Sequence, residues 1–416
     1  ELEEAMAVGY SIIAGGNNEA PGRERSDTSS TIATDAVEAA VRCLEDCPLF
    51  NAGRGSVFCN DGKNRMDASI MSCSYLVDDS GDGSCNNEND KIGPSTSAAG
   101  ESITIKEPHQ IIQRRKYPAS PQPTCGAVAG VEQVKNPVSL ARAVMDRTPH
   151  VMLIGKGAEE FSRSLPQDVV QTRPDEYFLT ERRWNQLVKV RELEAEQIQQ
   201  KEAEVGGKTN LVWKHMMKVQ LDHAGDADAN QDTLDQERKF GTVGAVALYC
   251  PCEKNSQSTN CRAQLASATS TGGLTNARFH RVGDSPIIGA GTYANHLCAI
   301  SCTGHGEHFL RCVAAHDIAK RLEYKHGYGN DRNEKRDKAD ALQRSVEEVI
   351  FGTLMGDGKD DEGGDGGVIA LDGYGNLSPS LTVRECTTGG STRMEPWKLE
   401  SFGTNDGKNM GNLKCT

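Results

Sequence analysis

The feature that most constrains this chain is a Gly-Thr pair set directly ahead of an apolar run. Residues 243–248 are uniformly apolar and have the length of a buried strand. A strand needs no threonine at its head, but a self-cleaving hydrolase needs both Gly241 and Thr242. The hydroxyl attacks the preceding carbonyl, and glycine best tolerates the unusual backbone conformation that this requires. On these residues alone, a threonine that merely starts a strand is the simpler interpretation.

Cleavage would also change the chemistry of Thr242. Its nitrogen is an amide in the intact chain, but it becomes a free α-amine once the bond before it is cut. An α-amine has an unperturbed pKa of about 7.7–8.0, so it can serve as the base for the hydroxyl of the same residue. The branched Cβ of threonine restricts χ1 and keeps that hydroxyl aimed. The pattern therefore indicates an N-terminal nucleophile.

Three blocks further along the chain favour this chemistry. Thr271-Gly272-Gly273 comes at the end of a second predicted strand, 263–271. The block Arg281-Val282-Gly283-Asp284-Ser285-Pro286 comes next, and Thr303-Gly304-His305-Gly306 completes the set. So many threonine–glycine pairs exceed what turns require. Together with Leu44–Gly55, the blocks resemble the plant-type L-asparaginase and isoaspartyl peptidase family of N-terminal-nucleophile hydrolases. The resemblance covers residues 35–160, apart from one insertion, and residues 241–371.

The resemblance implies a role for each matching residue. It implies Thr242 as the nucleophile, Thr271 as the residue that tunes it, and a cut between Gly241 and Thr242. It also implies an oxyanion hole from Thr303 and Gly304, whose donors would each contribute about 3–4 kcal/mol in the transition state. Asn51 would contact the amine of the nucleophile.

The resemblance also implies how the substrate is recognised. The family pattern places Arg281 on the α-carboxylate of the substrate and Asp284 on its α-ammonium, with the backbone of Gly306 helping to hold the ammonium. Without the resemblance, Arg281 and Asp284 would be read as a surface ion pair worth about 0–1 kcal/mol. The implied reaction cleaves the side-chain amide of L-asparagine, or an isoaspartyl dipeptide, and releases L-aspartate.

No cofactor is expected for catalysis, but the resemblance implies a structural sodium ion. A ring of backbone carbonyls suits such a hard cation. The implied ligands are the carbonyls of Leu44, Glu45, Cys47, Phe50, Ala52 and Arg54. Three cysteines, Cys250, Cys252 and Cys261, lie close together but lack a histidine, and we interpret them as ordinary residues rather than a metal site.

The resemblance implies an α+β fold, a four-layer αββα sandwich of the Ntn-hydrolase type, built as one domain over residues 1–416. The cut would give an α subunit of 1–241 and a β subunit of 242–416. Polar composition predicts insertions at about 17–33, 74–124 and 325–338, and a mobile linker at about 165–240. The charged segment 181–204 is predicted to be a solvated helix. The family strand that carries a His-Gly-Gly-Ala-Gly signature has no counterpart before the helix predicted at residues 2–16.

Several elements follow from periodicity. Val37, Ala40, Val41 and Leu44 share one face of a helix for which Thr34 is the expected N-cap. Segment 297–303 is predicted as a third strand beside 243–248 and 263–271. A single helix is expected from Glu307 to Tyr324.

Charge and hydropathy limit the partners. The net charge of −13 argues against a nucleic-acid or anionic-membrane surface. No apolar run reaches membrane-spanning length and no signal-peptide pattern opens the sequence, so we expect a cytoplasmic protein. The 14 cysteines form no compact paired framework, which favours reduced thiols. The family resemblance implies pairing of two units into (αβ)2.

Other functions share parts of this pattern. Aspartylglucosaminidases use the same threonine chemistry but are secreted. Threonine aspartases share the fold but lack the pairing at Gly283–Pro286 that contains Asp284. A non-catalytic relative that acts as a binding protein is the alternative from a different class, and the intact Thr242, Thr271 and Thr303 argue against it.

Overall fold

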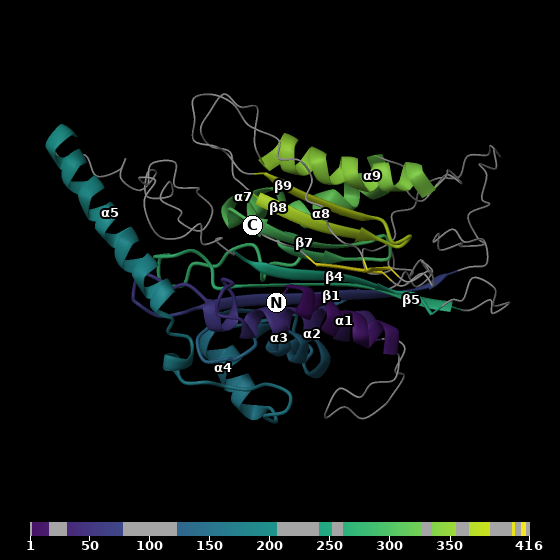
Figure 1. Cartoon of the computed structure of the whole chain (residues 1–416), viewed down its shortest axis with the longest axis horizontal. Coiled ribbons are helices and arrows are strands. Elements are labelled where there is room, and N and C mark those ends of the chain that lie inside the picture. The colour runs from purple at the N-terminus through teal and green to yellow at the C-terminus, as the bar shows by residue number, and fades with distance from the viewer. Residues whose placement is uncertain are drawn as a thin grey trace, which may run out of the picture.

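The computed structural model describes residues 2–15, 31–77, 123–205, 241–251, 261–325, 335–354, 366–382, 402–403 and 409–412. Within these ranges the chain forms two β-sheets with helices beside them (Figure 1). The predicted mixed fold of helices and strands is confirmed. No helix in the described part of the chain is long and apolar enough to cross a membrane.

The larger sheet carries the predicted nucleophile. Its strand order is β10 (Phe402–Gly403), β11 (Asn409–Asn412), β4 (Val243–Tyr249), β5 (Cys261–Thr271), β1 (Met66–Val77), β2 (Thr124–Val131) and β3 (Met152–Ile154). β4 and β5 are antiparallel, and Val243 pairs with Ser270. This register places Thr242 and Thr271 at the same end of neighbouring strands.

The smaller sheet has the order β6 (Thr292–Ala294), β7 (Cys298–Gly304), β8 (Gly366–Asp372) and β9 (Leu377–Thr382). The predicted strand at 297–303 is therefore present, but its expected place beside β4 and β5 is wrong. It belongs to the second sheet and packs against the first. β7 is buried on both faces, so its sequence does not reveal which sheet contains it.

Apolar side chains from both sheets form the layer between them. Met71 and Val246 come from the larger sheet, and Ile369 and Leu371 from the smaller one. A second core packs the larger sheet against α1 (Leu2–Gly15), α2 (Ile32–Asp46), α3 (Pro137–Arg147) and α4 (Gly155–Ser164). A third packs the smaller sheet against α7 (Gly306–Cys312), α8 (Ala314–Lys320) and α9 (Lys335–Glu347). Figure 1 shows the two groups of helices on opposite outer sides of the sheets.

The helix before the Asn51 loop begins earlier than predicted. Val37, Ala40, Val41 and Leu44 are buried as the spacing indicated. Thr34 is not the N-cap, because α2 starts at Ile32 with Thr31 at the cap position. The side chain of Gln264 in β5 accepts hydrogen bonds from the N–H groups of Ala33 and Thr34, at 2.8 and 3.4 Å. A long-range partner thus satisfies the first turn, and no local capping pattern could show it.

The helix expected from Glu307 to Tyr324 is broken. Val313 adopts a left-handed conformation with φ of 50° and separates α7 from α8. A π-helical turn, Arg321–Lys325, then ends the segment. A β-branched residue at positive φ is costly, so sequence propensity gave no warning of this break.

The interpretation of 165–240 as a linker needs correction for its first part. The segment holds a short 3₁₀ turn, Asp175–Tyr177, and the long helix α5, Glu181–Val205. Phe178, Arg183, Leu187 and Val190 are buried, so the first turns of α5 pack on the body instead of lying in solvent. Figure 1 shows the rest of α5 projecting outward. Of the apolar residues near the start of this helix, Leu187 is buried, whereas Trp184 and Val188 are exposed.

Other predicted segments fall partly outside the described residues. β1 continues to Val77 and β2 begins at Thr124, so both ends of the predicted insertion 74–124 are strand. Most of the insertions 17–33 and 325–338, the end of the linker from 206 to 240, and Cys252 lie outside the described residues.

Candidate active site

The two threonines predicted to work together are in direct contact. The Thr242 hydroxyl donates a hydrogen bond to Thr271 Oγ1 at 3.0 Å. The backbone N–H of Gly273 donates to the same Thr271 oxygen at 3.1 Å. Thr271 is buried, whereas Thr242 is partly exposed. Thr271 thus holds the Thr242 hydroxyl at the end of β4 while one side of Thr242 stays accessible.

Asn51 lies in the loop after α2 and contacts residues that come before and after the predicted cut in the sequence. Its backbone N–H donates to the carbonyl of Gly241 at 3.2 Å, and its carbonyl accepts from Gly272 at 2.8 Å. Its side-chain amide donates to the carbonyl of Gly273 at 2.7 Å and accepts from the N–H of Val57 at 3.0 Å. The structure therefore brings Asn51 to the residue before Thr242.

Glycine is required at position 272 for this contact. A Cβ there would lie 2.5 Å from Asn51 Oδ1 and 2.6 Å from the Cβ of Ser56. Such distances leave no room for a side chain. Gly272 therefore lets the end of β5 and the Asn51 loop approach each other closely.

Arg281 is paired, but not with the residue that the sequence suggested. Its Nε and Nη2 donate to the two carboxylate oxygens of Glu307, at 2.9 and 2.8 Å. This fork-shaped pair fixes the plane of the guanidinium. Within the described part of the chain, Nη1 donates to no group. A further carboxylate could therefore approach Arg281 along its Nη1 edge.

Asp284 is buried beside this pair. One of its oxygens, Oδ2, has no hydrogen-bond partner among the described residues. Burial is the main cause that raises the pKa of Asp284 to about 7, and the Arg281 charge offsets part of the rise. A buried acceptor without a partner carries a free-energy cost, which a bound cation would remove.

Gly306 lies against both charged residues. A Cβ on Gly306 would sit 2.8 Å from Arg281 Nη2 and 2.9 Å from Asp284 Oδ1. Gly306 also begins α7, the helix that carries Glu307 in its first turn. The helix start and the 281–284 segment are thus packed at backbone distance, and their charges converge on one small volume.

Asp67 supports the same segment from β1. It is buried, and its Oδ1 accepts from the N–H of Gly130 at 2.8 Å. Burial is again the main cause that raises its pKa to about 6, while hydrogen bonds from Gly130 and Gly283 and the charge of Arg281 oppose the rise. Asp67 is thus a buried carboxylate in strand β1 that holds the neighbouring backbone.

Thr303 and Gly304 end β7. Thr303 is buried, and its hydroxyl has no partner among the described residues. Gly304 has φ of 142°, a conformation that disfavours other residues. A buried hydroxyl without a partner is a donor available to a ligand oxygen.

The predicted cation loop is tightly wound around its own carbonyls. A Cβ on Gly53 would lie 2.3 Å from the carbonyl oxygen of Glu45, and one on Gly55 would lie 2.1 Å from that of Phe50. Both oxygens belong to the predicted ligand set of Leu44, Glu45, Cys47, Phe50, Ala52 and Arg54. Two of the other oxygens, those of Leu44 and Ala52, each accept one backbone hydrogen bond, which leaves a second lone pair. Glycine at 53 and 55 is therefore required for the backbone to pass this close to the carbonyls.

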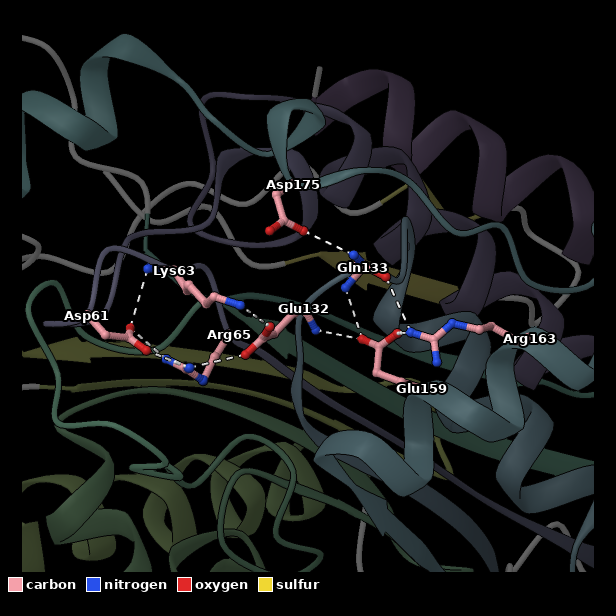
Figure 2. Close-up of polar contacts among 8 residues, drawn as sticks. All are labelled: Asp61, Lys63, Arg65, Glu132, Gln133, Glu159, Arg163 and Asp175. Atoms are coloured by element: carbon pink, nitrogen blue, oxygen red, sulfur yellow. Dashed lines mark hydrogen bonds and ion pairs between the residues drawn. The ribbon is translucent and has the colours of Figure 1, made fainter.

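A polar network lies next to the loop that leads to Arg281. Figure 2 shows the Arg65 side chain between Asp61 and Glu132. Arg65 donates to both Asp61 oxygens, at 2.8 and 2.7 Å, and lies 3.1 Å from Glu132 Oε1. Backbone N–H groups of Glu132 and Gln133 donate to Glu159 at 2.7 and 2.9 Å, which extends the network to α4. The Arg65 guanidinium is 4.6 Å from the ring centre of Phe279.

The structure brings the predicted site residues into two groups, one around Thr242 and one around Arg281. Glu307 was missed by the sequence reasoning. The sequence shows only that Glu307 is an acidic residue directly after Gly306. Acidic residues are common in the first turn of a helix, so this position does not by itself indicate a functional role. Among the described residues, no group of three or more His, Cys, Asp or Glu side chains could hold a metal ion.

Comparison with known proteins matches this sequence to one family. The sequence model of the family described as Asparaginase matches residues 26–77 and 120–395. The chain is 37% identical over 347 residues to an isoaspartyl peptidase of Salmonella typhimurium, covering 83% of the chain and 76% of that protein. It is 33% identical over 317 residues to a plant-type L-asparaginase of Pyrococcus horikoshii, covering 76% and 69%. A human isoaspartyl peptidase/L-asparaginase is 33% identical over 311 residues, with 74% and 65% covered.

Proposed function

This chain belongs to the asparaginase family, and we propose that Thr242 carries out its hydrolytic reaction. The chain is a hydrolase that cleaves the side-chain amide of L-asparagine and the isoaspartyl bond of β-aspartyl dipeptides, and it releases L-aspartate. The observation that supports this role is the hydrogen bond of 3.0 Å between the Thr242 hydroxyl and Thr271. Thr242 directly precedes the buried strand β4.

The first step is activation of the chain itself. The Thr242 hydroxyl attacks the carbonyl of Gly241, the C–N bond between the two residues breaks, and water opens the resulting ester. The N–H of Asn51, which donates to the Gly241 oxygen at 3.2 Å, stabilises negative charge as it develops there. Cleavage frees the amine of Thr242.

The enzyme then acts on external substrates. The freed amine takes the proton of the Thr242 hydroxyl, which attacks the side-chain carbonyl of the substrate. The Thr303 hydroxyl and the Gly304 N–H donate to the oxyanion. The amine returns the proton to the leaving ammonia or amino acid. Water then hydrolyses the aspartyl ester on Thr242 and releases L-aspartate.

The group of residues around Arg281 recognises the aspartyl end of the substrate. The Nη1 edge of Arg281 binds the α-carboxylate, while Glu307 holds the guanidinium plane. Asp284 binds the α-ammonium through Oδ2, with the backbone of Gly306 beside it. The support for this assignment is that Asp284 Oδ2 is buried without a partner among the described residues, as a receptor for a cation would be. L-Asparagine and β-aspartyl dipeptides present the same α-ammonium and α-carboxylate.

We propose the following organisation for the whole protein. The two sheets and their outer helices form a single four-layer αββα domain of the Ntn type. An α subunit of 1–241 and a β subunit of 242–416 share its core. The carbonyls of the Leu44–Arg54 loop hold a structural sodium ion, whose positive charge fixes the loop that carries Asn51. Two αβ units pair, and the protein is cytoplasmic.

An activity assay tests the function. The purified protein should release L-aspartate from a β-aspartyl dipeptide and ammonia from L-asparagine, and Thr242→Ala should do neither. Comparable activity in Thr242→Ala would remove Thr242 from the mechanism. If the wild-type protein is cleaved but inactive on both substrates, the substrate assignment is wrong.

A further inference from the structure

The turn that delivers Arg281 is held in an unfavourable backbone conformation. Asn276 and His280 both have φ of 60°, a left-handed conformation uncommon for residues other than glycine. The N–H of Arg281 closes the turn by donating to the carbonyl of Arg278 at 2.9 Å. Such backbone strain persists only where surrounding contacts impose it.

Those contacts come from the part of the chain before the predicted cut. The N–H of Asn276 donates to the carbonyl of Phe58 at 2.8 Å, and the N–H of Asn60 donates to the carbonyl of Ala277 at 2.9 Å. The guanidinium of Arg65 lies against the Phe279 ring, and the network in Figure 2 holds Arg65 in place. Turn 276–281 therefore rests on a surface that the future α subunit supplies.

Helix α5 adds the only side-chain hydrogen bond to Asn276 that the described residues show. Asn276 Nδ2 donates to Glu194 Oε2 at 2.7 Å. One turn earlier on the same helix, Arg191 donates to the carbonyl of Asn60 at 2.6 Å. Nearer the helix start, Arg183 donates to the carbonyl of Gly55 at 2.7 Å, and Trp184 packs edge-on against Phe58 at 5.4 Å between ring centres. Successive turns of α5 thus contact the loop after Asn51 and then turn 276–281.

We propose that Glu194 is a positioning residue for substrate reading, acting through Asn276 to aim Arg281. It does not touch the substrate. Its carboxylate fixes the Asn276 side chain and thereby the left-handed start of the turn, which ends at the guanidinium that reads the α-carboxylate. After the cut, a helix of the α subunit would control specificity in the β subunit. This inference rests on the function proposed for Arg281.

The location of Glu194 separates it from the bond-breaking machinery. Thr242 and Thr271 sit at the ends of β4 and β5, and Asn51 connects to them through Gly241 and Gly273. None of these residues has a described contact with Glu194. Partial burial is the main cause that raises the pKa of Glu194, and the Asn276 hydrogen bond opposes the rise, as expected where the carboxylate form accepts that bond. Loss of Glu194 should therefore weaken reading of the substrate more than chemistry at Thr242.

Kinetics with two matched substrates test this. One is a β-aspartyl dipeptide, and the other is the same compound with the aspartyl α-carboxylate converted to an amide. Arg281 would bind the α-carboxylate of the first substrate but not the amide of the second. The ratio of their kcat/KM values therefore measures how well Arg281 is positioned. Glu194→Ala should lower kcat/KM for the free acid about fivefold, mainly through KM, and shrink the ratio by the same factor. The extent of self-cleavage should stay unchanged.

Variant pairs provide the controls. Glu192→Ala removes an exposed acid from the same helix and should behave as wild type. Asn276→Asp places two acids face to face and should reduce the ratio. Adding Glu194→Gln to Asn276→Asp restores a donor–acceptor pair with reversed roles, and the ratio should recover.

Two outcomes would overturn the inference alone, provided that the wild type is active. One is an unchanged ratio in Glu194→Ala, whether kcat/KM is retained or falls equally on both substrates. The other is failure of the double variant to improve on Asn276→Asp. A wild type inactive on both substrates would instead overturn the proposed function, and the inference with it.

Discussion

The backbone N–H of Asn51 donates a hydrogen bond to the carbonyl oxygen of Gly241 across 3.2 Å. This contact polarises the carbonyl that the neighbouring Thr242 hydroxyl would attack. Asn51 is fixed in turn by Val57, Gly272 and Gly273. The loop after α2 thus acts as a rigid clamp on the proposed scissile bond, and self-cleavage should depend on that loop more than on the residues that read substrate.

Arg281→Ala should separate the two activities. Loss of the guanidinium removes the α-carboxylate partner and leaves Glu307 unpaired at the site, so kcat/KM should fall on the order of 100-fold or more. Self-cleavage should remain nearly complete, because Gly241 and Thr242 make no described contact with Arg281. Arg311→Ala, which removes an exposed arginine on α7, is the matched control. Equal loss of cleavage and turnover would mean that Arg281 is structural.

Asp284 should make ligand binding pH-dependent. Burial raises its pKa to about 7, so below that pH the carboxyl is largely protonated and cannot pair with an ammonium. Inhibition by L-aspartate, the expected product, should therefore strengthen as pH rises from about 5.5 to 8. A competitive inhibition constant measured across this range checks the prediction. Asp284→Asn should bind weakly with a flattened profile, and a wild-type constant that does not change with pH would contradict the assignment.

The raised pKa values also predict a trend in stability. The folded pKa values of Asp67, Asp284 and Glu45 are about 6, 7 and 8, all above the ordinary carboxyl values, and burial is the main cause in each. The folded chain therefore binds more protons than the unfolded chain between about pH 4 and 8. Stability of the ligand-free protein should fall as pH rises through this window. Glu45→Gln should reduce the slope in thermal unfolding, and an unchanged slope would contradict the assignment of Glu45.

The sodium proposal predicts a cation effect. Replacing Na⁺ by tetramethylammonium at constant ionic strength should lower the Tm by about 2 °C or more, since an ion bound only to the folded state stabilises it. Returning Na⁺ should restore the Tm with saturation. Gly53→Ala, whose Cβ would lie 2.3 Å from the Glu45 carbonyl oxygen, should abolish the response. A Tm that is the same in both salts would argue against a sodium site.

The sequence was most informative where chemistry and local structure coincide. The strands predicted at 243–248 and 263–271 are present as β4 and β5, and the Thr242–Thr271 contact follows from their pairing. The family pattern named Arg281, Asp284 and Gly306, which the structure brings together. In these cases the residues lie at strand ends or in glycine-rich turns, whose signals are local.

The sequence was least informative where distant segments decide the structure. Glu307 lies 26 residues from Arg281, and no periodicity links them. The break at Val313 opposes its intrinsic backbone preference. Arg183 is buried because the carbonyl of Gly55 accepts its Nε, so a charged helix that composition describes as solvated is docked. Each of these features depends on a tertiary partner.

Mass spectrometry of the purified protein, read beside its activity, tests the central claim most directly. The account predicts two chains that end at Gly241 and begin at Thr242, with activity that appears only as the intact mass disappears. Thr242→Ala should remain a single inactive chain, and Thr242→Ser should be cut and active. Full activity from a preparation that retains the uncut mass would contradict the account, because an amide nitrogen cannot serve as the base.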